Sequence, residues 1–333
     1  QGQDDPERYI QRFRGSHRTV LDYLAGEVLA SLGEDTRRFL FWTSVMDWFN
    51  ADACRAVSGR DDAAEVLAFL EQSNMFIVPL DDERNWYRYH HLFSDYLRSQ
   101  LSREEQSQAC LRAAAWYESR DLIEQAVDHA LASRDADAAA GYLGRALNRD
   151  STWSSGNMGL LSSWLDALPS RTLEDRPQLC LDASRILYLK GRFDQAEARI
   201  TQAEQILERR DDFPEKHGLA AAASIYRGAI AAVRGQSSEA MGLISGALEA
   251  LPQENHLVRG RAFFSLGLAN ELTGQLEQAV DHYLEASEEA EAAGVLFLAV
   301  HARCAAAQVQ IQQGRLFLAE EACQKAIMLA DGQ

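Results

Sequence analysis

A glycine–alanine pattern recurs four times in the second half of the chain. Each copy has a glycine, an alanine five residues later and another alanine twelve residues after the glycine. The glycines are Gly191, Gly235, Gly274 and Gly314; the first alanines are Ala196, Ala240, Ala279 and Ala319; the second are Ala203, Ala247, Ala286 and Ala326. Successive glycines are about 40 residues apart, and a repeat of this length forms one unit that buries its core only by stacking on its neighbours. The pattern therefore predicts a solenoid.

The spacing within each copy fits a pair of helices. A glycine can end the first helix because it adopts a left-handed backbone conformation without strain. Small residues seven positions before each glycine allow the two helices to approach closely, and an apolar residue nine positions after it fills the space between them. The small residues are Ser184, Gly228, Gly267 and Ala307, and the apolar ones are Ile200, Ile244, Tyr283 and Cys323. This pattern resembles tetratricopeptide (TPR) repeats.

A weaker copy lies upstream, with Asp121 in place of the glycine and Ala114 and Ala126 at the expected offsets. We expect the aspartate only to shift the end of a helix. We assign residues 101–175 to irregular helical repeats and residues 176–333 to a right-handed superhelix of TPR-like repeats.

The first third of the chain has a different organisation. Residues 19–32, 34–46, 51–59 and 61–74 read as helices, with Asp61 placed to cap the fourth. Two short strands, 75–80 and 86–90, flank a polar turn, and a helix follows at 91–101. Helices followed by a hairpin predict a winged-helix domain over residues 19–100, preceded by a linker at 1–18. The expected fold class is mainly α.

Charge and composition exclude several functions. The net charge is −17, and the helix in the DNA-reading position of the winged helix (61–74) has four acidic residues and no lysine or arginine. Phosphates repel such a helix, so we expect no DNA binding by this chain. The five cysteines are scattered and form no CxxC pair, which indicates buried thiols in a cytoplasmic protein and no metal site. No nucleophile–base set and no membrane-length apolar run occurs, so we expect neither an enzyme nor a membrane protein.

Two stretches carry a family resemblance: "NMFIVPLDDERNWYRYHHLFSDYLRSQL" (74–101) and "AAAWYESRDLIEQAVDHALASRD" (113–135). They resemble the MalT-like, ATP-dependent LuxR-type transcription activators, which belong to the STAND class of signal-transduction ATPases. The resemblance implies a P-loop ATPase module first, then a winged helix, a TPR-like sensor domain and a LuxR-type DNA-binding domain. No GxxxxGK[ST] motif occurs here, and the sequence does not begin with Met, so we expect a fragment of a longer protein.

For such a fragment, the resemblance implies no cofactor of its own but ATP or ADP in the full-length protein. Its expected partners are a small-molecule effector or regulatory protein and its own ATPase module, with self-association on activation as a further possibility. The alternative is a general TPR interaction scaffold, or the sensor arm of another STAND-type protein.

The segment "WYRYHHLF" (86–93) contains two adjacent histidines. In STAND proteins a histidine of an "MHD"-like motif contacts the phosphate of ADP, and "YHHL" matches that motif with His90 at the contact position. A histidine suits this task because it donates a hydrogen bond to a phosphate oxygen. A purely structural role, a metal site and catalysis are the alternatives. We expect His91 to point away from His90, and Tyr87, Tyr89 and Phe93 to lie in the core.

A solenoid of paired helices offers a groove lined by the first helix of each pair. Residues 13, 10, 6 and 3 positions before each repeat glycine are expected to face it, a rule that includes Ile225. The candidates for contacting an effector or partner are Arg185, Tyr188, Arg261, Phe264, His301 and Gln308. The alternative is that they form an ordinary exposed helix face.

Overall fold

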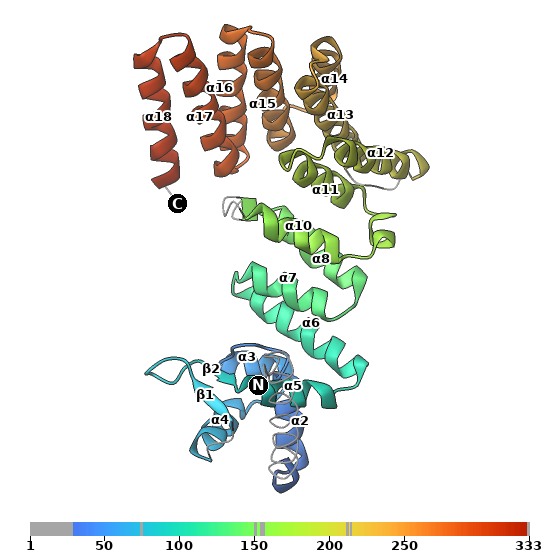
Figure 1. Ribbon diagram of the computed structural model, residues 1–333, viewed down its shortest axis with the longest axis vertical. Helices are drawn as coiled ribbons and strands as arrows, with labels where there is room; N and C mark the ends of the chain where they lie inside the picture. Colours follow the sequence, from blue (N-terminus) through green and yellow to red (C-terminus); the bar gives the residue numbers. More distant parts are fainter. Residues whose placement is uncertain are drawn as a thin grey trace, which may run out of the picture. The chain divides into compact units, whose positions relative to one another are not determined.

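The computed structural model describes residues 29–73, 76–149, 152–153, 157–210, 213 and 215–331. These residues are mostly helical, as Figure 1 shows, and the predicted mainly-α class is confirmed. The chain divides into two compact units, residues 1–142 and 143–333. The predicted linker at 1–18 and most of the predicted helix at 19–32 lie outside the described residues.

The first unit contains the predicted helices and hairpin. The elements are α2 (Glu34–Thr43), α3 (Ala51–Ser58), α4 (Ala63–Gln72), β1 (Ile77–Pro79), β2 (Tyr87–Tyr89), α5 (His91–Gln100), α6 (Arg103–Ser119) and α7 (Ile123–Ala132). Helix α8 (Ala136–Leu147) continues into the second unit. The two strands pair antiparallel, with Ile77 opposite Tyr89. Phe49, before α3, adds an antiparallel bridge to Tyr87.

The aromatic residues of β2 and α5 close the core of this unit. Tyr87, Tyr89 and Phe93 are at most 7% exposed, which confirms their predicted place in the core. The Tyr89 ring lies 4.6 Å from that of Phe49 and 5.9 Å from that of Phe93. Its hydroxyl shares a 2.7 Å hydrogen bond with Thr43 Oγ1, so the buried phenol is not left unpaired.

The predicted cap of α4 is wrong. The helix begins at Ala63, and the residue at its N-cap is Asp62, not Asp61. No side chain forms a capping hydrogen bond at this end of α4. The Asp62 carboxylate instead accepts hydrogen bonds from the Arg60 guanidinium, with 2.8 Å between Arg60 Nε and Asp62 Oδ1. The Arg60 hydrogen bond lowers the pKa of Asp62. Charge pairing thus takes precedence over capping here.

The second unit is a succession of helix pairs (Figure 1). Helix α10 (Met158–Ala167) and the 3-10 turn η1 (Ser170–Leu173) precede them. The pairs are α11 (Pro177–Leu189) with α12 (Phe193–Arg209), α13 (Lys216–Val233) with α14 (Ser237–Ala250), α15 (His256–Leu272) with α16 (Leu276–Ala292), and α17 (Leu296–Gln312) with α18 (Leu316–Asp331). The four pairs match the four predicted repeats.

The turn inside each pair is the same. The four repeat glycines have φ between 71° and 78°, and the residue after each donates a 2.9 Å hydrogen bond to the carbonyl five positions back. This is the Schellman arrangement that ends a helix. Asp121 adopts φ 61°, and Leu122 N–H donates to Tyr117 O at 2.9 Å in the same way. The expected shift of the helix end at Asp121 therefore does not occur.

The small residues before two of these turns lie in direct contact with the partner helix. A Cβ added at Gly228 would be 2.5 Å from Ile244 Cγ1, and one at Gly267 would be 2.6 Å from Tyr283 Cδ1. Ile244 and Tyr283 are at most 2% exposed. The predicted combination of a small residue and an apolar filler is thus confirmed for these two pairs.

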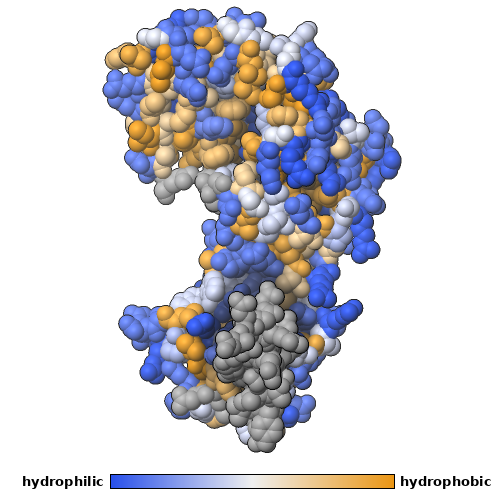
Figure 2. Space-filling view, in the orientation of Figure 1, coloured by the Kyte–Doolittle hydropathy of each residue, from blue (hydrophilic) through white to orange (hydrophobic). Residues whose placement is uncertain are grey.

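Two of the five cysteines contradict the prediction of buried thiols. Cys54, Cys110 and Cys180 are buried, but Cys304 and Cys323 are exposed. Cys323 is the filler of the last pair, and α18 has no later helix packed against it among the described residues. Figure 2 shows apolar surface at this end of the unit, where α18 begins with the exposed Leu316 and Phe317.

Candidate functional site

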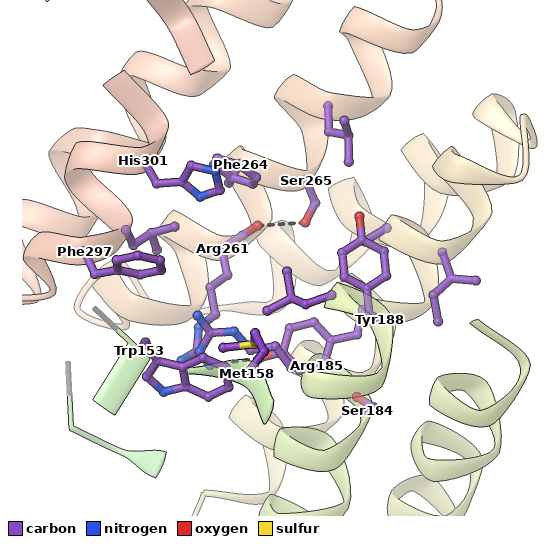
Figure 3. A pocket seen from close by; sticks show the side chains of 16 residues that line it. Trp153, Met158, Ser184, Arg185, Tyr188, Arg261, Phe264, Ser265, Phe297 and His301 are labelled. Carbon is purple, nitrogen blue, oxygen red and sulfur yellow. Dashed lines mark hydrogen bonds between the residues drawn. The ribbon is translucent and has the colours of Figure 1, made fainter. Parts of the chain in front are cut away.

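A pocket of about 140 Å³ opens on the face formed by the first helices of the four pairs (Figure 3). Helix α13 packs against both α11 and α15, and α15 packs against α17, so their side chains meet on one surface. The lining residues are Trp153, Met158, Ser184, Arg185, Tyr188, Leu189, Tyr226, Ala229, Ile230, Arg261, Phe264, Ser265, Leu268, Phe297, Leu298 and His301.

Five of the six candidate groove residues line this pocket: Arg185, Tyr188, Arg261, Phe264 and His301. The sixth, Gln308, is exposed on α17 and is not part of the lining. The rule that selected them also placed Ile225 in the groove, but Ile225 is fully buried and packs in a cluster with Ile244. The rule fails there because α13 is covered by α11, α14 and α15.

Sequence reasoning missed several large lining residues, among them Trp153, Met158, Tyr226 and Phe297. Tyr226 and Phe297 lie on first helices, nine and seventeen positions before their repeat glycines, and were outside the offsets that we counted. Trp153 and Met158 come from the irregular region, which has no repeat register. A search for aromatic residues along the whole first helix of each pair would have found Tyr226 and Phe297.

Aromatic rings form much of the wall. The His301 ring lies 4.9 Å from that of Phe264 and 6.0 Å from that of Phe297. Figure 3 shows these three side chains on one side of the pocket and Trp153 on another. The guanidinium of Arg185 lies over the Trp153 ring, 3.6 Å from its centroid. A cation at this distance is attracted by the negative face of the indole.

Arg261 extends from α15 into the pocket (Figure 3). Its Nη1 donates a 3.0 Å hydrogen bond to the Tyr226 hydroxyl, while its Nε is buried and has no hydrogen-bond partner. Among the described residues, no carboxylate lies within ion-pair distance of this guanidinium. A half-buried positive charge with an unused donor is a strong site for an anion.

A buried carboxylate lies near the two arginines of the pocket. Asp182 on α11 is 2% exposed and accepts hydrogen bonds from Gln178 Nε2 at 3.1 and 3.2 Å. Burial raises its pKa to about 6, while the charge of Arg261, the Gln178 hydrogen bond and the charge of Arg185 oppose the rise. The pKa of His301 is lowered, first by desolvation and then by the charge of Arg185, which favours the neutral imidazole.

His90 occupies the N-cap position of α5 in the first unit. Its side chain is exposed, and its ring stacks on that of His91 with 4.5 Å between centroids. The prediction that His91 points away from it is therefore wrong; the junction is tight enough to bring both rings together. The pKa of His90 is lowered by desolvation and by the neighbouring His91 and Arg88.

Two further features bear on the class of protein. Within the described ranges, no group of three or more His, Cys, Asp and Glu side chains is arranged to hold a metal ion. None of the helices described here has both the length and the apolar character needed to cross a membrane.

Comparison with known proteins agrees with this architecture. The family model of the MalT winged helix domain matches residues 25–109, and that of the MalT-like TPR region matches residues 221–333. Neither model is a catalytic domain. The chain is 28% identical over 312 residues to the HTH-type transcriptional regulator MalT of Vibrio campbellii, which covers 92% of this chain and 34% of that protein. It is 28% identical over 340 residues to MalT of Klebsiella pneumoniae, covering 100% of this chain and 37% of the relative.

A solved structure has a similar fold. It is a STAND protein with a TPR sensor from Pyrococcus horikoshii, matched with a TM-score of 0.56 and 16% identity over 93% of this chain and 53% of that chain.

A winged helix followed by a TPR region is the arrangement of a regulatory sensor arm. In these two regions the chain is similar to the MalT-type transcription regulators. It spans about a third of the length of the curated relatives that it matches.

Proposed function

We propose that this chain is the signal-sensing and regulatory region of an ATP-dependent LuxR-type transcription regulator of the cytoplasm. The superhelix binds an effector, and the winged helix holds the ATPase module of the full-length protein inactive until the effector is bound. The observation that carries the effector role is the pocket on the first helices, where side chains of α11, α13, α15 and α17 converge. One ligand there contacts several repeats at once, so it favours one arrangement of them over others.

Two neighbouring phenylalanines on α15 provide the test of the effector role. Phe264 lines the pocket, whereas Phe263 is outside it and packs near His282 and Arg259. In the full-length regulator, Phe264→Ala is expected to raise the effector concentration needed for half-maximal transcription about tenfold or more, because an aromatic wall is lost. Phe263→Ala removes the same side chain outside the pocket and is the matched control. Equal responses of both variants contradict the effector role.

The winged helix controls the ATPase module through His90 in this proposal. Its exposed side chain, free of a hydrogen bond to the folded chain among the described residues, is available to a phosphate oxygen of ADP bound to that module. The nucleotide belongs to the full-length protein and not to this chain.

His91 offers a matched control for this contact, because it is an exposed histidine stacked on His90. In the full-length regulator, His90→Ala is expected to speed ADP release and raise transcription without effector, while His91→Ala changes both less. Bound ADP after gel filtration and reporter transcription measure the two effects. Unchanged ADP retention in His90→Ala rules out the contact.

A further inference from the structure

We propose that the pocket binds a small aromatic anion: a molecule with one flat apolar ring and one carboxylate, the carboxylate held by Arg261. This inference rests on the proposed effector role and names the chemical class of the effector.

The charges of the pocket favour an anion. Among the described residues that line it, the formally charged side chains are Arg185 and Arg261, and none is an aspartate or glutamate. The carboxylate of Asp182 interacts with both arginines, but it is buried and paired with Gln178. Arg261 therefore brings a positive charge to a lining that has no carboxylate among its described residues.

Arg261 is the side chain that recognises the anion. Among the described residues, its guanidinium donates one hydrogen bond, to the Tyr226 hydroxyl, and its Nε is buried without a partner. Among the described residues no carboxylate lies within ion-pair distance of this half-buried guanidinium, so a ligand anion that neutralises its charge is favoured. A carboxylate meets this need, because its two oxygens match the two donor directions of a guanidinium.

The volume and walls of the pocket select the rest of the ligand. About 140 Å³ is close to the roughly 150 Å³ of a cavity that holds one benzene ring. The rings of Phe264 and His301, 4.9 Å apart, form one wall, and the Trp153 indole covered by Arg185 forms part of another (Figure 3). Flat rings stack or pack edge-on against such walls.

The polar atoms of the lining argue against an uncharged carbohydrate. Sugar hydroxyls need several donors and acceptors, but no asparagine, glutamine, aspartate or glutamate is among the described lining residues. The Ser184 hydroxyl donates to Leu181 O at 2.7 Å and that of Ser265 donates to Arg261 O at 2.9 Å, so both donors are already used. The Tyr226 hydroxyl already accepts from Arg261.

Isothermal titration of this chain with four probes tests the proposal. Phenylacetate carries both the ring and the charge, phenylacetamide is its uncharged counterpart, acetate lacks the ring, and an uncharged trisaccharide represents carbohydrates. Phenylacetate is expected to bind about tenfold or more tightly than each of the others, because only it satisfies both the walls and Arg261.

Two substitutions locate the binding. Arg261→Met is expected to weaken phenylacetate binding about tenfold or more and to leave phenylacetamide binding unchanged. Arg234→Met removes the same charge from an exposed arginine paired with Asp194 and Glu197, and is the control. If Arg261→Met fails to fold, as judged by circular dichroism, Arg261→Gln replaces it.

The proposal is overturned if phenylacetate and phenylacetamide bind with equal affinity. It is also overturned if Arg261→Met binds both probes as tightly as the native chain does. So does a trisaccharide that binds more tightly than phenylacetate. In that case, a response of the full-length regulator that depends on Phe264 and not on Arg261 leaves the effector role standing with a neutral ligand. If neither Phe264→Ala nor Arg261→Met changes the response of the full-length regulator, the effector role is ruled out as well.

Discussion

At the scale of single residues, the second unit places a carboxylate where water is almost absent. Asp182 is 2% exposed, and its pKa of about 6 lies above the ordinary value of 3.8. The folded state therefore holds the proton of this group more tightly than the unfolded chain does. It follows that Asp182 destabilises the fold in its charged form, although Gln178 and the two pocket arginines offset part of the cost.

The sign of this effect gives a pH prediction. The contribution of Asp182 to the free energy of unfolding is most favourable below pH 3.8, where its carboxyl is protonated in both states. This contribution falls as the pH rises through about 6. Above that pH the buried carboxylate is charged and destabilises the folded state to the full extent. Asp182→Asn is neutral at every pH and keeps a hydrogen bond to Gln178. We expect it to be more stable than the native chain at neutral pH by up to about 3 kcal/mol, with the difference vanishing in acid.

Urea unfolding of both proteins from about pH 4 to pH 8 measures this difference. Asp281→Asn, at an exposed aspartate of α16, controls for the loss of one negative charge. A stability difference that stays constant with pH contradicts a titrating Asp182.

At the scale of elements, the repeat motif sets how closely two helices approach. Gly267 on α15 faces the ring of Tyr283 on α16, and the Tyr283 hydroxyl donates to Glu271 Oε2 at 2.8 Å. The ring is thus fixed at both its face and its hydroxyl. A methyl group at Gly267 has no room unless this contact shifts.

Gly267→Ala is therefore expected to lower the free energy of unfolding by about 1–2 kcal/mol, because overpacking outweighs the better helix propensity of alanine. Gly246 lies inside α14 with nothing within 4 Å of an added Cβ. Gly246→Ala is the matched control and is expected to raise the free energy of unfolding by about 0.5–1 kcal/mol. Thermal or urea unfolding measures both, and a stabilised Gly267→Ala contradicts the close contact.

Most elements were predicted within a few residues, because their signals are local. Period-2 and helical patterns gave β1, β2 and α3 to α5, and the repeat glycines gave the four turns of the second unit. The cap of α4 was not predictable from composition, since Asp61 and Asp62 are equally good capping residues and the Arg60 pairing decides the position. The stacking of His91 on His90 was missed for a similar reason: it depends on the angle at which β2 meets α5.

At the scale of the whole molecule, each compact unit has a hydrophobic core of its own. In the first, Phe49, Tyr89 and Phe93 belong to one cluster. In the second, the buried residues form several smaller clusters, such as that of Ile225 and Ile244 and that of Tyr283 and Val309. In a repeat array each repeat is stabilised mainly by contacts with its neighbours. A substitution that destabilises one helix pair is therefore expected to affect that pair and the pairs next to it.

Hydrogen exchange tests this expectation. Gly267→Ala should speed exchange of the backbone amides in α15, α16 and the adjoining α17, while those of α2 to α5 in the first unit keep their native rates. Gly246→Ala should speed neither set. Faster exchange in α2 to α5 would show that the two units lose their structure together.

The sequence by itself determined the helix pairs and the wing, because each rests on spacing along the chain: a glycine at a turn or an alternation of apolar residues. A fixed offset on one helix face only selected candidates for the groove. Only the tertiary structure decided that Arg185, Tyr188, Arg261, Phe264 and His301 line one pocket while Gln308 does not. It also decided that Trp153 and Met158 complete the wall. A pocket depends on the curvature of stacked helices and on a segment without repeat register, and neither is encoded in the spacing of any single repeat.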